Sequence, residues 1–242
     1  LCLNVMQDTI VIALGGSLLS SDESDKINLW KIDFVNLINS VLDSGVKIFI
    51  VVGGGKLARK NIAKAKNDGI VDEFQLDLIG INATRENARD VIKSFENVQN
   101  LNKNVPKSID DVLISFGNYD LTIMGGTVPG HTTDTVAIKL AKEINSKLVV
   151  IATNVSHVYT GDPREDRNAT PIEKLSLKEL GELSGVGKPI QPGSSFAVDP
   201  VGVSLAIDHN LPLVILNGHD VENLRKAIYG EPFNGTIVYG DD

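Results

Sequence analysis

Three glycine-rich turns stand out as residues whose type and spacing could do chemistry. They are Gly15-Gly16-Ser17, Gly53-Gly54-Gly55-Lys56 and Gly125-Gly126-Thr127. Glycine lets the backbone approach a bound phosphate closely, and successive backbone N–H groups can then point at one anion. A helix that begins after such a turn adds a favourable partial positive charge. Because each turn follows a β-type run, the three together predict phosphate binding.

These turns differ from two widespread nucleotide-binding loops. The chain contains neither GxxxxGK[ST] nor GxGxxG. Both patterns place glycines at fixed positions around the phosphates, and the first adds a lysine. Their absence argues against a P-loop protein and against a dinucleotide-binding protein.

Charged and hydroxyl side chains follow the second and third turns. Lys56 and Arg59 stand at the start of a predicted helix, where the helix dipole disfavours a cation unless an anion lies between them. The alternative is that both are solvated surface cations. Thr132, Thr133 and Asp134 form a helix N-cap cluster. They cap the helix, and they could also donate to a phosphate and orient reacting groups or a metal.

The elements that must position these residues alternate along the chain. Thr9 to Leu14 and Val46 to Val52 are β-branched apolar runs, typical of strands buried on both faces of a parallel sheet. Between them, Leu29 to Leu42 carries an apolar helical stripe that ends at Gly45. Further strands are predicted at 121–124, 148–152, 213–216 and 236–239, and further helices at 133–144 and 221–228. The alternation predicts a three-layer α/β/α sandwich with a mostly parallel central sheet.

Composition limits the class of protein. No long linker divides the 242 residues, so we expect a single domain over residues 1–242, with a boundary between two halves near Ser146. The formal charge of −8 argues against a nucleic-acid partner, which needs a basic face. No apolar run approaches the roughly 18 residues that span a membrane. One cysteine, Cys2, excludes a disulfide framework, and four scattered histidines make a metal site improbable.

These features together predict a cytoplasmic protein without a membrane partner. Residues 1–6 are too short for the apolar region of a secretory signal. Met6 precedes the first predicted strand, so either native translation starts there or the chain is processed or truncated.

Seven motifs carry a resemblance to a known family. They are IALGGSLL (12–19), VVGGGKLARK (51–60), DLIGINATRENA (77–88), MGGTVPGHTTDTVA (124–137), TNVSHVYTGDP (153–163), PGSSFAVDP (192–200) and NGHDVENLRKAIYGE (217–231), the last followed by GTIV. In this order they resemble the amino acid kinase superfamily and, within it, the archaeal-type uridylate (UMP) kinases. The resemblance runs over nearly the whole chain from about Thr9. GGGKLAR with DLIGI and GGT-PGHTTD separates this group from carbamate, acetylglutamate and aspartate kinases.

The resemblance implies an enzyme that transfers the γ-phosphoryl group of ATP to UMP. The products would be UDP and ADP, in pyrimidine nucleotide biosynthesis, with Mg²⁺ accompanying ATP. The family also implies a homohexamer built from dimers. Residues from about 1 to 145 would form the acceptor-side half, and residues from about 146 to 242 the nucleotide-side half.

The resemblance also implies a set of site residues. For ATP they are Gly16, Ser17, Gly55, Arg59, Thr153, Asn154, Tyr159 and Asp162. For UMP they are Gly54, Asp77, Thr127, Val128, Pro129, Gly130, His131, Thr132 and Thr133. Asp77 would accept hydrogen bonds from the ribose hydroxyls. Asp134 and Lys56 would act at the phosphoryl-transfer centre. Asp134 is expected to organise the reactants rather than to remove a proton, because the UMP phosphate is already anionic.

The chain departs from the family pattern at two places. Many amino acid kinases have a lysine just before the first glycine pair, where this chain has Ala13 and Leu14; Lys56 is the candidate for the missing charge. The family's Asn-Val-Asp-Gly-Val-Tyr has Ser156 and His157 in place of Asp and Gly. That exchange removes a charge and a flexible backbone position beside the donor pocket, so it bears on ATP affinity and donor-base preference. We expect His157 to be a surface loop residue.

Two alternatives to a UMP kinase stay open. The first is a kinase of the same fold for another small phosphate, such as isopentenyl phosphate. That group resembles this chain in its glycine turns but uses a histidine near the second turn, and GGGKLAR has none. The second is a nucleotide-binding regulator or storage protein without turnover, which only the Ser156-His157 exchange favours.

Overall fold

The computed structural model describes residues 8–20, 24–163, 166–187 and 198–240. The strands are β1 (Thr9–Leu14), β2 (Lys47–Val52), β3 (Leu121–Met124), β4 (Leu148–Thr153), β5 (Val158–Tyr159), β6 (Pro171–Ile172), β7 (Lys174–Ser176), β8 (Leu213–Asn217) and β9 (Gly235–Tyr239). The helices are η1 (Gly16–Leu19), α1 (Ser24–Asp43), α2 (Gly55–Asn67), α3 (Glu73–Lys93), α4 (Ile109–Ile114), α5 (Thr133–Glu143), α6 (Leu177–Leu183), α7 (Pro200–Asp208) and α8 (Val221–Ile228). The expectations for Cys2 and Met6, and residues 192–197 of the PGSSFAVDP motif, lie outside the described residues.

The large sheet has seven strands in the order β3-β2-β1-β4-β8-β9-β7. Neighbours from β3 to β8 are parallel, β9 runs antiparallel to β8, and β7 is parallel to β9. A separate antiparallel pair joins β5 to β6. The mostly parallel central sheet predicted from the alternating pattern is therefore confirmed.

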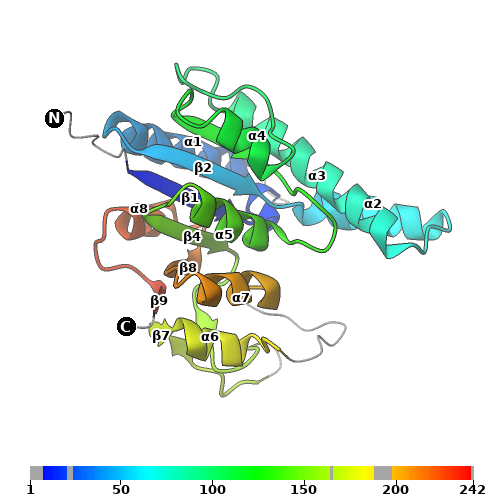
Figure 1. The fold of residues 1–242 in the computed structure, drawn as a ribbon, viewed down its shortest axis with the longest axis vertical. Helices are drawn as coiled ribbons and strands as arrows, with labels where there is room; N and C mark the ends of the chain where they lie inside the picture. Colours follow the sequence, from blue (N-terminus) through cyan, green and yellow to red (C-terminus); the bar gives the residue numbers. More distant parts are fainter. Residues whose placement is uncertain (1–7, 21–23, 164–165, 188–197, 241–242) are drawn as a thin grey trace.

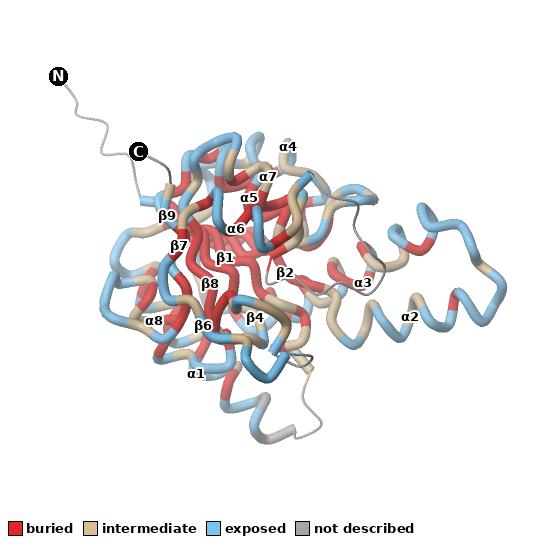
Figure 2. The backbone as a smooth tube through the Cα atoms, turned by 90° about the horizontal axis from the view of Figure 1, so that it is seen from below, coloured by how far each residue is buried: buried red, intermediate tan, exposed pale blue. Residues whose placement is uncertain are grey.

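Helices cover both faces of this sheet (Figure 1). Along β1, the side chains of Ile10 and Ile12 point into a core shared with α1, α8 and the second half of α3. Val11 and Ala13 point into the opposite core, shared with α5, α6 and α7. Figure 2 shows the buried strands running between these two layers. This arrangement confirms the three-layer sandwich, and it explains why the strands read as continuous apolar runs.

Helix α2 and the first half of α3 project beyond the sheet as a two-helix arm (Figures 1 and 2). The arm exposes several large apolar side chains at its tip. They include Val71, Phe74 and Leu78, with exposed fractions of 87%, 59% and 40%. The arm begins directly at the second glycine turn, since Gly55 is the first residue of α2.

Helix α1 packs against the sheet in the core that contains Ile10 and Ile12. Its predicted stripe is buried at Phe34, Leu37, Ile38 and Val41, and the chain leaves the helix at Gly45 with a φ of +86°. Trp30 and Phe34 stack with their ring centroids 5.2 Å apart. The indole Nε1 of Trp30 donates a 2.8 Å hydrogen bond to the carbonyl of Gly218, which ties α1 to the loop after β8.

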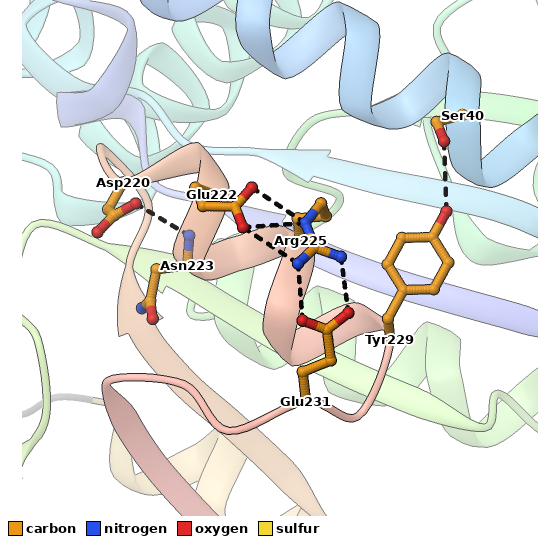
Figure 3. A network of polar contacts seen from close by, with 7 residues as sticks. All are labelled: Ser40, Asp220, Glu222, Asn223, Arg225, Tyr229 and Glu231. Carbon is orange, nitrogen blue, oxygen red and sulfur yellow. Dashed lines mark hydrogen bonds and ion pairs between the residues drawn. The ribbon is translucent and has the colours of Figure 1, made fainter.

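A polar network closes the end of α8 (Figure 3). Arg225 donates to the carboxylates of Glu222 and Glu231, at 3.0 Å and 2.7 Å. The guanidinium lowers the pKa of both carboxyl groups by hydrogen bonding and by its charge. Tyr229 reaches across to Ser40 of α1, 3.4 Å away. The Tyr229 contact links the end of α8 to α1, while the ion pairs tie α8 to the segment that follows it.

Within the described ranges, no helix is both long enough and apolar enough to cross a membrane.

Candidate functional site

The three glycine turns lie in a row along one edge of the sheet. Because β3, β2, β1 and β4 are adjacent and parallel, their carboxyl ends meet at the same edge. The third turn therefore lies beside the second, the second beside the first, and the first beside the β4–β5 loop. Backbone bonds of 2.9 Å confirm the contacts, from Gly53 N to the Leu14 carbonyl and from Gly15 N to the Ala152 carbonyl. Ligands of parallel α/β sheets bind at such edges.

The first and second turns touch backbone to backbone. A Cβ atom built on Gly16 would lie 2.2 Å from the backbone nitrogen of Gly55 and 2.6 Å from the carbonyl carbon of Gly53. Gly55 also has a φ of +53°, and a Cβ there would lie 2.2 Å from the Gly16 carbonyl oxygen. Backbone atoms cannot move aside as a side chain can. These positions therefore accept only glycine, and the two turns form one rigid unit.

Helix α3 braces the second and third turns from below. Asn87 donates from Nδ2 to the carbonyls of Gly53 and Gly54, at 2.8 Å and 3.1 Å. The Thr84 hydroxyl accepts from the backbone N–H of Gly126 at 2.7 Å. One helix thus fixes both turns relative to each other.

Arg85 extends this brace to a third segment. Its guanidinium donates to the carbonyls of Gly126, Thr127 and Lys107, at 3.2 Å, 3.1 Å and 3.1 Å. Burial, and then the nearby charge of Arg89, lowers the pKa of Arg85, with Asp111 opposing both. An arginine keeps its charge through such a shift because its ordinary pKa lies far above neutral pH. The brace is therefore cationic and faces the backbone of the third turn.

The sequence motif 77–88 contained these braces, but no role was predicted for Thr84, Arg85 or Asn87. A signal was present in their spacing. Thr84 and Asn87 stand seven and ten residues after Asp77, which is close to two and three helical turns and places all three side chains on one face of α3.

Asp77 meets the loop that was predicted to hold UMP. Its carboxylate accepts a 2.8 Å hydrogen bond from the backbone N–H of Gly130, which has a φ of +82°. Asp77 is exposed, as are Val128 and Gly130, while Pro129 and His131 are half-buried. The structure therefore brings together Asp77, near the start of α3, and the loop 127–133, which follows the end of β3.

Thr132, Thr133 and Asp134 start α5, as predicted. Thr132 is the N-cap residue, and its hydroxyl accepts from the backbone N–H of Thr135 at 3.2 Å. The Thr132 hydroxyl also donates to the carboxylate of Asp199. Asp199 in turn caps α7 and accepts from the Thr135 hydroxyl at 2.9 Å. Two helix N-termini thus meet around one carboxylate whose role the sequence analysis did not predict.

Asp134 is the most perturbed carboxyl group at this junction. Burial of its carboxyl group, and then repulsion from Asp199, raises its pKa to about 7. The residue as a whole keeps intermediate exposure. A carboxyl group that is half-ionised near neutral pH is typical of functional sites.

The two predicted cations, Lys56 and Arg59, lie directly after the second glycine turn. Lys56 and Arg59 are exposed on the first turns of α2. Lys56 and Lys60 line an open groove with Gly16, Gly54 and Asn87. Two lysines therefore stand over the point where the first and second turns touch.

The remaining predicted donor residues gather at the end of β4. Thr153 ends the strand, and its hydroxyl donates to the side chain of Asn154 at 3.4 Å. Tyr159 is half-buried in β5, and the carbonyl of Asp162 accepts from the backbone N–H of Asp166. Ser17 lies in η1, at the end of β1, the strand that neighbours β4.

His157 corrects one expectation. It was expected on the surface, but it is buried, with an exposed fraction of 8%. Its Nδ1 lies 3.0 Å from the hydroxyl of Ser156, and its ring stands edge-on to the ring of Tyr159. The prediction was wrong because the next residue, Val158 of β5, is hydrogen-bonded to Thr236 of β9, which holds this part of the loop against the sheet.

The comparisons with known proteins agree with this geometry. Residues 8–217 match the amino acid kinase family. The uridylate kinase of Methanococcus aeolicus is 36% identical over 229 residues, covering 95% of this chain and 98% of that protein. The uridylate kinase of Methanocaldococcus jannaschii is 37% identical over 233 residues, covering 96% and 99%.

Solved structures show the same fold. The crystal structure of uridylate kinase from Archaeoglobus fulgidus superposes with a TM-score of 0.81 at 35% identity, covering 95% of this chain and 99% of that one. UMP kinase from Bacillus anthracis gives a TM-score of 0.75 at 26% identity, with 97% of each chain covered. With the glycine row and the N-cap cluster in place, the chain belongs to the amino acid kinase family.

Proposed function

We propose that this protein is a UMP kinase, which transfers the γ-phosphoryl group of ATP to UMP and releases ADP and UDP. One observation carries the proposal: the order of the phosphate turns along the sheet edge. The β4–β5 loop and the first turn form one end of the row, and the third turn with Asp77 forms the other. The rigid contact between the first and second turns lies between them. A donor and an acceptor phosphate bound in this row would meet at the second turn.

The division of roles follows from this order. ATP would bind at Gly16, Ser17, Gly55, Arg59, Thr153, Asn154, Tyr159 and Asp162. UMP would bind at Gly54, Asp77 and the loop Thr127, Val128, Pro129, Gly130, His131, Thr132 and Thr133. The relatives' names support uridylate as the acceptor. Asp77 suits a ribose because a carboxylate accepts hydrogen bonds from two adjacent hydroxyls.

Catalysis in this site is mainly positioning and charge stabilisation. Phosphoryl transfer passes through a loose transition state with the attacking and leaving oxygens in line. Backbone N–H groups of the glycine turns, with Lys56 beside them, supply preorganised positive potential. The UMP phosphate attacks as an anion, so no general base is required. Asp134 would organise the reactants as a carboxylate, and a neighbouring cation would shift it toward that form.

Mg²⁺ is proposed to enter as part of the nucleotide substrate. Among the described residues, no group of three or more His, Cys, Asp or Glu side chains could hold a metal ion. Magnesium usually binds one or two carboxylates together with substrate phosphates. Asp134 and Asp199, whose charges repel each other, fit that pattern. The ion would neutralise phosphate charge there.

The assembly and setting are also proposals. Exposed Leu29 and Ile32 on α1, and Phe74 and Leu78 on the α2–α3 arm, offer apolar surface for a homohexamer built from dimers. Light scattering after size exclusion should then give six times 26.0 kDa. We further propose that the protein is cytoplasmic, with no nucleic-acid or membrane partner.

ADP release tests the function directly. The protein is mixed with Mg·ATP and, separately, UMP, CMP, AMP and isopentenyl phosphate. We expect turnover with UMP in large excess over the others. Turnover confined to another acceptor would overturn the proposal in favour of a kinase for that acceptor. Tight nucleotide binding without turnover would overturn it in favour of a regulator.

A further inference from the structure

A three-member polar chain runs from the β4–β5 loop into β5, among the residues proposed to bind ATP. The hydroxyl of Ser156 is 3.0 Å from the phenol oxygen of Tyr159 and 3.0 Å from Nδ1 of His157. The His157 and Tyr159 rings meet edge-on, with centroids 6.2 Å apart. His157 is buried, whereas Ser156 and Tyr159 keep intermediate exposure. The chain therefore runs from the protein interior outward to the phenol.

The backbone under this chain is firmly held. The backbone N–H of Val158 donates to the hydroxyl of Thr236 in β9 at 2.8 Å, and that hydroxyl donates to the carbonyl of Ile172 at 2.6 Å. Val158 also pairs with Ile172 in the β5–β6 ladder. On the other side of Tyr159, the backbone N–H of Thr160 donates to the carbonyl of Thr170 at 3.1 Å. The phenol meets the Ser156 hydroxyl, which meets His157, so these two residues set the direction of the phenol hydrogen.

Counting hydrogens gives this chain two arrangements. A serine or tyrosine hydroxyl has one hydrogen, and a neutral histidine has one N–H. If Nδ1 of His157 accepts from Ser156, then Ser156 accepts from Tyr159, and the phenol oxygen can only accept from a ligand. If Nδ1 donates to Ser156, the serine hydrogen is released from His157 and can point at the phenol oxygen, and the phenol can then donate to a ligand. Burial lowers the pKa of His157, which keeps the ring neutral and both arrangements open.

The family pattern allows only one of these arrangements. An ionised aspartate at position 156 accepts hydrogen bonds and donates none. It would draw the phenol hydrogen toward itself and leave the Tyr159 oxygen as an acceptor. The exchange to serine removes that restriction.

We propose that Ser156 and His157 are positioning residues that set the hydrogen-bonding direction of the Tyr159 phenol, and that they widen donor specificity to purine nucleotides with either an amino group or a carbonyl at the base edge. Adenine presents an amino donor at its six position, and guanine presents a carbonyl acceptor there. The inference rests on the proposed function, because it takes Tyr159 as part of the donor site. Ser156 and His157 would thus influence the choice of donor nucleotide without contacting UMP.

Steady-state kinetics with two donors test this role. The assay measures kcat/KM for Mg·ATP and Mg·GTP at saturating UMP, in the wild type and in Ser156→Asp. We expect the wild type to use both donors within about tenfold. Ser156→Asp should lower kcat/KM for GTP relative to ATP by about three- to tenfold, the size of one hydrogen bond. KM for UMP should not change.

Two further variants separate direction from packing. Tyr159→Phe placed in the Ser156→Asp background should abolish the added discrimination between ATP and GTP, because Ser156 acts on donor choice only through the Tyr159 hydroxyl. Thr160→Ala removes a hydroxyl that accepts from Thr170 N on the same β5–β6 hairpin, and it should leave the donor ratio unchanged. Equal losses of kcat/KM for ATP and GTP in Ser156→Asp would overturn the inference. So would a double variant, Ser156→Asp with Tyr159→Phe, that keeps the added discrimination between the two donors.

Calorimetric binding of ATP and GTP without UMP gives a readout that does not depend on turnover. The dissociation constants should show the same change of ratio in Ser156→Asp. If the wild type binds both nucleotides but turns over no acceptor, the proposed function fails while the donor ratio still decides the inference. If the ratio is unaltered in an active enzyme, the inference alone fails.

Discussion

The two ends of the glycine row are held in different ways. At the proposed acceptor end, α3 supplies Thr84, Arg85 and Asn87 to the backbone of the second and third turns. At the proposed donor end, Thr236 also holds the backbone of β5, but the phenol of Tyr159 belongs to a chain of three polar side chains with two possible hydrogen arrangements. Contacts to backbone atoms fix a position uniquely, whereas hydroxyl chains leave a choice. We therefore expect specificity for the acceptor to be fixed by a rigid backbone, and specificity for the donor to change more easily with substitutions.

The largest effect is expected where the two ends meet. Gly16→Ala would place a Cβ 2.2 Å from a backbone nitrogen, so the variant should lose more than about 4 kcal/mol of unfolding free energy or fail to fold. Gly45→Ala is the control, because a Cβ there meets nothing within 4 Å. Its positive φ alone should cost about 1–2 kcal/mol. Denaturant unfolding followed by circular dichroism measures both, and similar losses would show that the turns do not interlock.

Asp134→Asn should stabilise the protein in a pH-dependent way. The pKa of Asp134 rises from 3.8 to about 7 on folding. The folded state therefore keeps its proton while the unfolded chain ionises, so wild-type stability falls as pH rises from about 4 to 7. At about 1.36 kcal/mol per pH unit, the upper limit of this loss is about 4 kcal/mol.

The variant has no such proton to lose. Its unfolding free energy should equal that of the wild type near pH 4 and exceed it at pH 8. Parallel stability curves for the two proteins would mean that Asp134 ionises normally in the folded state. The ratio of kcat/KM for ATP and GTP should be unaffected, since Asp134 lies in the first turn of α5 and not in the β4–β5 loop.

Asp77→Asn tests the acceptor end alone. Losing a charged acceptor of ribose hydroxyls should raise KM for UMP by about ten- to a hundredfold, while KM for ATP stays within about twofold. Asp72→Asn is the matched control on the same helix, because asparagine also caps helices well. Equal losses for UMP and ATP would show that the ribose binds elsewhere.

Asn87→Ala should give the smallest effect, spread over both ends. It removes two hydrogen bonds to the second turn and should cost about 1–2 kcal/mol of stability. KM should rise for both substrates, since that turn bridges them. Asn223→Ala is the control: it removes two comparable bonds, to Asn234, far from the row. It should lower stability without changing either KM, and a matching change in both variants would mean that Asn87 acts only through stability.

The sequence predicted the regular frame of the molecule well. The bounds of β1, β3 and α8 match the predicted ranges, because each is a dense apolar or amphipathic run between clear breakers. The short strands β5, β6 and β7 were not predicted. Two or three residues carry too little periodic signal, and these strands form only by pairing with distant segments.

The site was predicted in its glycines and caps but not in its cross-links. The Thr132 cap was predicted because capping is local. No role was predicted for Asp199, which joins Thr132 and Thr135 from more than sixty residues away. The burial of His157 was also missed, since it depends on Thr236 holding the neighbouring backbone. Local chemistry is readable from sequence, whereas a contact between distant segments requires the fold.

Trp30 gives the molecule a natural optical reporter. It is the one tryptophan in the sequence, it is buried, and its indole is hydrogen-bonded to the loop after β8. A Cβ on Gly218, the partner in that bond, would lie 2.4 Å from Leu18 of η1, which directly follows the first glycine turn. Fluorescence excited at the indole band therefore comes from a single place, behind the donor end of the row. Its emission wavelength records whether that side of the protein is intact, without any label.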